Sequence, residues 1–570
     1  MKTVTNVYAV CAFAALGGCL FGMDIASMSG VLGTSAYKNY FNHPRSFTQG
    51  YITASMPLGS IFSTLGSSCM SDRFSRKIAI QLACILWIIG SAYVLHSLSK
   101  CPTLIILRRL QSGSNGVPML CVGRFVAGLG VGIASAVVPV YQAEIAPKEI
   151  RGRVVTLQQW AITWGILIQY FVQYGASHVG NGPDSPTQST AAFRIPWALQ
   201  TIPAFILAIG LFWFPYSPRW LAGQDRWEEA IMVLADLHAH GNVKHPKVLA
   251  QYREIEEALR FEKEVAAAGW SGLLDKKIAK RVLSGMSVQT WAQLCGMNVM
   301  MYYIVYIMET ANIGTPLLTA SIQYIINVVL TLPAILYIDT WGRRPTLLLG
   351  ALSMMALLFT SGALQAIYGT PTTVPDSDLS WHIVDNAPAS RGVVACSYLF
   401  VATFAVSWGP VSWTYPAEIF PNRVRAKGTS LTTATNWVFN TVLAFAVPPL
   451  LYRIGWRMYI LFGTFNAIAF VQVFFTIPET KQFSLEEMDA VFEGPAWRGP
   501  KKESRLDDLE LQIECGVVDV RGPKGLDWED RGSWEGSSSM SKGGIGVETT
   551  VEMRESWVDS GGWAGPGRAL

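Results

Sequence analysis

The sequence has little charge for its length. Only 15% of its 570 residues are Asp, Glu, Lys or Arg, whereas 51% are hydrophobic and the mean hydropathy is +0.30. A soluble domain usually carries about a quarter charged residues. The deficit therefore requires long stretches that contact lipid rather than water. The net charge of +4 is too small to indicate a nucleic-acid partner.

Several other signals are missing. The nine cysteines form no even-numbered secreted framework, and most lie inside apolar runs, where they act as small hydrophobes. No Asn-x-Ser/Thr glycosylation acceptor occurs anywhere in the chain. The first apolar run begins near Val7, lacks a convincing cleavage site and is too long for a signal peptide, so it is interpreted as a retained span.

No pattern in the chain indicates an enzyme, a cofactor or a metal. A nucleophile–base arrangement is not seen. The glycines Gly128, Gly130 and Gly132 suggest nucleotide binding only superficially, because they lie inside an apolar span; close helix packing explains them better. His238 and its neighbours His240 and His245 have no partner Cys or acid at ligand spacing, which favours a solvated face over a metal site.

Apolar runs of about 18–25 residues are long enough to cross a bilayer as helices. The sequence predicts twelve such spans, at roughly 7–31, 51–70, 78–96, 118–141, 154–174, 195–213, 283–309, 316–338, 345–368, 392–413, 429–451 and 456–477. A charged, helix-prone stretch separates the sixth from the seventh, and a polar tail follows the twelfth. The expected domains are a first six-helix half, a helical linker, a second six-helix half and a disordered tail, at 1–221, 222–280, 281–493 and 494–570.

Two motifs occur twice, six spans apart. Residues 141–153 after the fourth span and 415–427 after the tenth share Tyr-x-Ala-Glu-Ile-x-Pro and a closing basic residue. Residues 72–77 after the second span and 339–344 after the eighth share Asp-x-x-x-Arg followed by a second basic residue. Such a parallel repeat predicts two six-helix halves related by an axis along the membrane normal.

The four loops that carry these motifs are richer in Lys and Arg than the opposite loops, which modestly favours placing them inside the cell. An even number of spans puts both termini and the linker on that same side. We therefore expect a multi-pass protein in the plasma membrane, with both termini cytoplasmic.

The order of these motifs relative to the spans resembles the sugar porter family of the major facilitator superfamily, and within it the fungal monosaccharide and high-affinity glucose transporters. The resemblance covers about residues 5–493. Its further motifs are Gly123-Arg124, Ser217-Pro218-Arg219, Gln293-Leu-Cys-Gly296-Met-Asn298 with Tyr302-Tyr303, and Pro478-Glu479-Thr480-Lys481. The resemblance implies an all-α membrane protein of twelve helices that moves a monosaccharide, glucose first among the candidates, by alternating access.

A sugar site needs amides, which donate and accept hydrogen bonds, and aromatic planes against C–H faces. The residues that match sugar ligands of the family are Phe21, Gln159, Gln293, Asn298, Asn327, Trp413 and Asn436. Gln293 and Asn298 straddle Gly296, where a helix distortion would aim both inward. Interhelical hydrogen bonding is the competing role for these amides, and packing is the competing role for the aromatic residues. Tyr302 and Tyr303 resemble an outer gate, with plain packing as the alternative.

Asp24 is the only acid in the first span, and a carboxylate there should face a cavity or a cation. Arg124 is the partner that the resemblance implies. A pair that alternates between ion-paired and protonated states would couple transport to protons; a static pair in a uniporter is the alternative.

The duplicated motifs imply an inner gate, in which acids and bases at helix ends bridge the two halves. Glu144 with Arg153, Glu418 with Arg425, and Asp72 with nearby arginines are the candidate pairs. The full set of inner-gate residues is Asp72, Arg76, Glu144, Arg153, Asp339, Arg343, Glu418 and Arg425.

The chain departs from the family pattern at several positions. Ser75 replaces a usual Gly, Thr340 a basic residue, Tyr216 a Glu and Ala292 a second Gln, and the stretch 101–116 is unusually long. The tail and the departures at Tyr216, Thr340 and Ala292 keep a transporter-like sugar sensor as an alternative. A facilitative uniporter and a carrier of a polyol, disaccharide or quinate are further alternatives.

Overall fold

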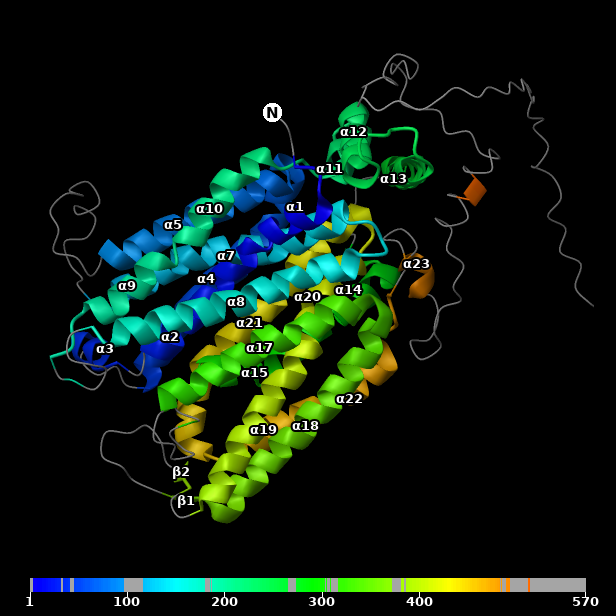
Figure 1. The fold of residues 1–570 in the computed structure, drawn as a ribbon. Coiled ribbons are helices and arrows are strands. Elements are labelled where there is room, and N and C mark those ends of the chain that lie inside the picture. Colours follow the sequence, from blue (N-terminus) through cyan, green and yellow to red (C-terminus); the bar gives the residue numbers. More distant parts are fainter. Residues whose placement is uncertain are drawn as a thin grey trace, which may run out of the picture. The chain divides into compact units, whose positions relative to one another are not determined.

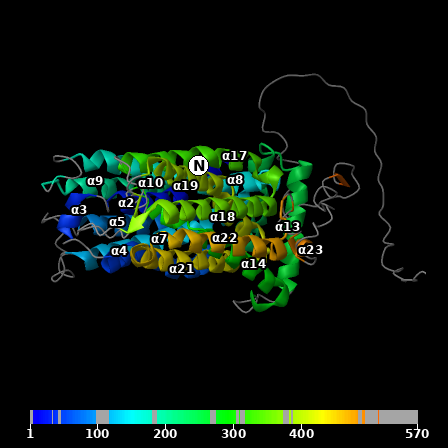
Figure 2. The ribbon, with the colours of Figure 1, turned by 90° about the horizontal axis from the view of Figure 1, so that it is seen from below.

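The computed structural model describes residues 4–31, 34–41, 46–96, 116–179, 185, 187–264, 273–302, 304, 308, 316–371, 381–383, 386–481, 483, 488–492 and 511–512. The predicted tail at 494–570, apart from two residues, and the extended stretch 101–115 lie outside this part. Each of the twelve predicted spans contains helix, and Figures 1 and 2 show these helices side by side.

The first six spans correspond to helices of the first half. They are α1 (Val7–Ala14) with α2 (Leu16–Val31), α4 (Ser46–Phe74), α5 (Arg76–His96), α7 (Val117–Ile145), α8 (Arg151–Ser177), and α9 (Ala191–Leu199) with α10 (Ile202–Gly210) and the 3-10 turn η1 (Leu211–Trp213). The short helix α3 (Ser35–Tyr40) follows the first span.

The second six spans correspond to helices of the second half. They are α14 (Lys276–Leu294) with α15 (Met297–Tyr302), α17 (Pro316–Trp341), α18 (Arg343–Tyr368), α19 (Ala387–Val406) with α20 (Trp408–Glu418), α21 (Asn422–Ile454) and α22 (Arg457–Thr476). A two-residue antiparallel pair, β1 (Thr370–Pro371) and β2 (Trp381–His382), pairs Thr370 with His382; α23 (Met488–Val491) follows the last span.

The packing repeats as the sequence repeat requires. In the first half α4 and α5 pack on α7, and in the second half α17 and α18 pack on α19. Likewise α2 packs on α8 in the first half, and α14 on α21 in the second. The halves meet along two symmetry-related seams, α4 against α21 and α8 against α17. Any cavity on the axis is therefore walled by both halves.

Many helices extend several residues beyond the predicted apolar runs, because the charged motifs continue the helices at their ends. Among the described residues, eight stretches of helix are long and apolar enough to cross a membrane by composition alone. The remaining spans carry more polar residues. Ser60 and Thr64 of α4, for example, donate to the carbonyl oxygens of Gly128 and Gly132 in α7 at 2.9 and 3.1 Å.

The linker forms three helices, α11 (Pro218–Gly223), α12 (Trp227–His238) and α13 (Pro246–Glu264), gathered at one end of the spans (Figure 1). The first begins before the predicted boundary at 222. His238 was expected on a solvated face, and this was wrong: its ring nitrogens lie 2.6 Å from Gln251 Oε1 and 2.9 Å from the Ile145 carbonyl oxygen. Burial lowers the pKa of His238. His238 therefore joins the linker to α7.

The glycines of α7 allow close packing, as predicted. A Cβ added to Gly128 would lie 2.1 Å from the Met56 carbonyl oxygen of α4, whereas one added to the exposed Gly66 would meet nothing within 4 Å. In an ordinary helix Ala is more stable than Gly by roughly 0.5–1 kcal/mol.

We therefore expect Gly128→Ala to lower the melting temperature of the purified protein in detergent, because α4 and α7 must separate. The matched control Gly66→Ala should leave it unchanged or raise it slightly. Equal melting temperatures for the two variants would contradict this packing.

Candidate functional site

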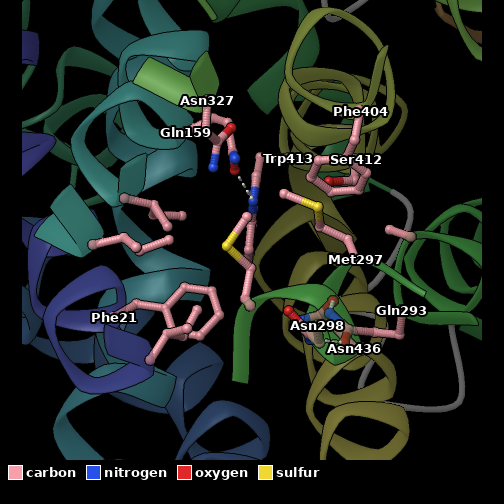
Figure 3. A pocket seen from close by; sticks show the side chains of 15 residues that line it. Phe21, Gln159, Gln293, Met297, Asn298, Asn327, Phe404, Ser412, Trp413 and Asn436 are labelled. Atoms are coloured by element: carbon pink, nitrogen blue, oxygen red, sulfur yellow. Dashed lines mark hydrogen bonds between the residues drawn. The ribbon is translucent and has the colours of Figure 1, made fainter. Parts of the chain in front are cut away.

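A cavity with about 480 Å³ of empty volume lies between the two halves. Its lining comes from eight helices: α2, α8, α14, α15, α17, α19, α20 and α21. The structure brings all seven predicted sugar ligands into this lining (Figure 3): Phe21, Gln159, Gln293, Asn298, Asn327, Trp413 and Asn436.

One wall is a cluster of amides from the second half. Gln293 Nε2 donates to Asn436 Oδ1 at 2.6 Å, and Gln293 Oε1 accepts from Asn298 and, at 3.4 Å, from Asn440. The distortion expected at Gly296 is present: α14 ends at Leu294, Gly296 has φ of +100°, and α15 restarts at Met297. A φ in that region favours glycine. The break places amides from two consecutive helices on one side of the cavity.

The opposite wall is largely apolar. Phe21, Ile25, Ile162 and Ile166 contribute aromatic and aliphatic surface from the first half. Trp413 spans the two walls: its Nε1 donates to Gln159 Oε1 at 3.1 Å, and its ring centroid lies 6.4 Å from that of Phe21. A sugar carries hydroxyls around a ring with apolar C–H faces. A wall of amides opposite an apolar wall is therefore complementary to it.

Two buried amide atoms in this lining make no hydrogen bond within the described residues: Asn327 Oδ1, an acceptor, and Asn436 Nδ2, a donor. Their side chains are 2% and 1% exposed. A buried polar atom without a partner costs free energy, roughly 1–3 kcal/mol. A sugar hydroxyl both donates and accepts, so it could satisfy either atom.

The predicted pair of Asp24 and Arg124 is formed. Arg124 Nη2 lies 2.8 Å from Asp24 Oδ2, both side chains are buried, and Arg124 Nε also donates to the Ile52 carbonyl oxygen at 3.1 Å. Tyr302 is buried and lies close enough to Asp24 and Arg124 to interact electrostatically with both charges. Tyr303 lies outside the described residues.

The acidic and basic groups at the linker side pair differently from the sequence expectation. Glu144 binds Arg76 at 3.0 Å rather than Arg153, and Glu418 binds Arg343 at 2.6 Å rather than Arg425. These predicted pairings were wrong because, in each half, the glutamate at the end of one helix lies beside the arginine that begins a neighbouring helix. Each ion pair is therefore internal to its half.

In each half a second acid joins the glutamate and the arginine, so the chain contains two matching networks of charges. Asp72 lies 3.4 Å from Arg76, and Asp339 lies 3.0 Å from Arg343. Hydroxyls missed by the sequence prediction also take part: Ser217 donates to Glu144 at 2.5 Å and Thr480 to Glu418 at 3.2 Å. Both follow the last span of their half, so the internal repeat could have identified them.

The bridge between the halves runs through Asp339. Its Oδ2 accepts from the backbone N–H of Arg153 at 2.9 Å, at the start of α8, where the helix dipole favours a carboxylate. Arg153 thus contributes its backbone to the bridge. Arg425 instead donates to the Phe420 carbonyl oxygen of its own half at 3.1 Å.

The departures Ser75 and Tyr216 are linked. In the second half Glu479 accepts from the Arg343 and Arg344 amides at 2.9 and 3.1 Å and so caps α18. Tyr216 cannot do this for α5; it stacks on Trp220, with Lys77 over its ring. Ser75 takes part of the role, because its Oγ accepts from the Ile78 amide at 3.4 Å.

Comparison with known proteins agrees with this arrangement. The family model described as "Sugar (and other) transporter" matches residues 10–492. The chain belongs to this sugar transporter family. The family assignment confirms the predicted membrane-protein class and shows a transporter rather than an enzyme.

Individual relatives are similar over most of their length. An MFS glucose transporter of Aspergillus flavus is 57% identical over 91% of this chain and 96% of its own. A high-affinity glucose transporter of Kluyveromyces lactis is 42% identical over 87% of each chain, and a high glucose sensor of Saccharomyces cerevisiae is 32% identical over 84% of this chain but 60% of its own.

Among solved structures, the proton:xylose symporter XylE of E. coli bound to 6-bromo-6-deoxy-D-glucose is 28% identical, with a TM-score of 0.71 over 85% of this chain and 99% of its own. This likeness confirms the predicted twelve-helix major facilitator fold.

The bridge at Asp339 leaves no room beside Gly152. A Cβ there would lie 2.2 Å from both Arg343 Nη2 and Asp339 Oδ1, whereas one on Gly175 of the same helix would meet nothing within 4 Å. We expect Gly152→Ala to open the linker side and to slow transport about 5- to 100-fold, the equivalent of an overpacking cost of roughly 1–3 kcal/mol. Transport assays at matched membrane levels check this, with Gly175→Ala as control. Equal rates for both variants would contradict the bridge.

Proposed function

We propose that the protein carries glucose or a closely similar hexose across the membrane by alternating access. The observation that carries this proposal is the cavity between the halves, in which an amide wall faces an apolar and aromatic wall. The glucose transporters at 57% and 42% identity support the choice of sugar.

Within this proposal the seven lining residues named above are the sugar ligands. Gln293 and Asn436 would bind hydroxyls from the amide wall, and Gln159 with Trp413 would bind at the other side, the indole against C–H groups. The buried Oδ1 of Asn327 and Nδ2 of Asn436 would each form a hydrogen bond to the sugar. The net gain per hydrogen bond is about 1 kcal/mol.

Alternating access requires that contacts on the two sides of the cavity break in turn. At the linker side the halves meet through Asp339 with Arg153, and Ser67 Oγ lies 3.3 Å from Ser430 Oγ. On the other side Ser29 hydrogen-bonds to Tyr324 at 3.2 Å. Contacts between the halves are therefore formed on both sides of the cavity. The linker-side networks would form the inner gate, and Tyr302 with Tyr303 the outer gate.

Proton coupling through Asp24 is the finer part of the proposal. A carboxylate that loses its Arg124 partner in the apolar interior must become protonated or reach water. The similarity to a proton:xylose symporter supports this reading. A uniporter would keep the pair closed throughout its cycle.

We also propose that the linker side faces the cytoplasm of a plasma-membrane protein. The basic residues of the duplicated motifs lie on that side, as the positive-inside tendency requires. The division into 1–221, 222–280, 281–493 and 494–570 is retained, with the linker helices starting at Pro218.

Uptake of labelled glucose by yeast that lack their own hexose carriers tests the proposal. We expect uptake from the intact chain, and its loss both with a protonophore and in Asp24→Asn. Uptake that is unchanged by the protonophore and by Asp24→Asn indicates a uniporter. No uptake of any labelled sugar, from protein shown at the cell surface, would overturn transport and favour the sensor.

The amide wall can be tested separately. Gln293→Ala removes the group that holds Asn436 and Asn298, and we expect the KM for glucose to rise about 10- to 100-fold, since two or more hydrogen bonds are lost. The control Gln365→Ala removes a buried amide bonded to Tyr459, away from the cavity, and should leave KM unchanged. An unaltered KM in Gln293→Ala would remove this residue from the sugar site.

A further inference from the structure

We propose that Tyr324 of α17 is the latch that holds the broken helix α15 closed over the cavity and joins the two halves on the side away from the linker. This inference rests on the proposed alternating-access transport, since a latch has a role only if that side opens. It assigns a positioning role to Tyr324, Gln323 and Ser29, none of which lines the cavity.

The first observation is that side chains of α17 donate hydrogen bonds to two consecutive backbone carbonyls of α15. Gln323 Nε2 donates to the Met300 carbonyl oxygen at 3.1 Å, and Tyr324 Oη donates to the Met301 carbonyl oxygen at 3.1 Å. Both side chains of α17 are fully buried. They fix the position of the short helix that carries Asn298 and Tyr302.

The second observation is that the same hydroxyl reaches the other half. Tyr324 Oη lies 3.2 Å from Ser29 Oγ of α2, and the Tyr324 ring contacts Tyr170 of α8 with centroids 4.6 Å apart. One phenol thus contacts three helices besides its own: α2 and α8 of the first half and α15 of the second. If α15 moves away or the halves separate on this side, these contacts break together.

The third observation is the position of this group along the helices. Tyr324 lies one turn from the cavity residue Asn327, Ser29 one turn from Ile25, and Tyr170 one turn from Ile166. All three lie on the turn farther from the linker. The latch therefore closes the cavity immediately beyond the proposed sugar site.

Tyr324 and Ser29 share one hydrogen bond, which makes their variants interdependent. Tyr324→Phe keeps the ring and loses both hydroxyl contacts. Ser29→Ala loses the contact between the halves and a hydrogen bond to the Ala26 carbonyl oxygen of its own helix. Because hydrogen bonds contribute modestly in net terms, each lost contact should shift the balance toward the open state by about 3- to 10-fold.

The experiment measures how fast a membrane-impermeant maleimide labels Ile166→Cys, a cavity position, in intact cells. The parent chain without this cysteine gives the background from native thiols. We expect Tyr324→Phe to label several-fold faster, Ser29→Ala less so, and the double variant no faster than Tyr324→Phe, because the shared bond is already gone.

Matched controls exclude general loosening. Tyr337→Phe changes an exposed tyrosine of the same helix, stacked on Trp341, and Ser397→Ala changes a buried serine bonded only within its own helix. Both should label at the parent rate, and surface expression should be equal throughout. Unchanged or slower labelling in Tyr324→Phe, or additive effects of the two variants, would overturn the latch.

Failure of the latch can be told apart from failure of the proposed function. Glucose should slow labelling of Ile166→Cys if the cavity binds it. Faster labelling in Tyr324→Phe without protection by glucose would keep the latch and reject glucose as the ligand. Protection by glucose with an unaffected rate in Tyr324→Phe would keep the sugar site and reject the latch.

Discussion

The carboxylate of Asp339 joins the two halves at the linker side. Asp339 binds the guanidinium of Arg343 in its own half and the backbone amide of Arg153 in the other. Because Arg343 is buried and also binds Glu418, the whole group must stay paired. The closed linker side thus depends on a cluster of charges whose contacts cannot be broken one at a time. This favours two discrete arrangements of the halves over a continuum.

The two halves share this design but differ at the turn that precedes the third helix of each half. Gly342 adopts φ of +89° and Ser75 adopts +88° at the equivalent turn, so the first half uses a non-glycine residue where the backbone favours glycine. The second half caps the following helix with Glu479. The first half has Tyr216 there, and Ser75 Oγ accepts a longer hydrogen bond from the Ile78 amide. The turn before α18 is therefore better capped than the turn before α5.

The sequence predicted the cavity lining well, because an amide such as Gln293 or Asn436 inside an apolar run can scarcely face lipid and must point inward. It also located the break at Gly296, since glycine between two amides marks a distortion. It identified the pair of Asp24 and Arg124 but failed on the partners of the two glutamates. Glu144 has several arginines within reach along the chain, and only the relative placement of helices selects Arg76. Tyr324 gave no signal, because a tyrosine in an apolar span is ordinary.

The central claim is that the cavity between the amide wall and Trp413 is where the sugar binds. An experimental structure of the full chain, determined with glucose at saturating concentration, tests it most directly. The account predicts density for one pyranose ring against Trp413, within hydrogen-bond distance of Gln293 and Asn436. Density for the sugar elsewhere, with this cavity filled only by side chains, would contradict the account.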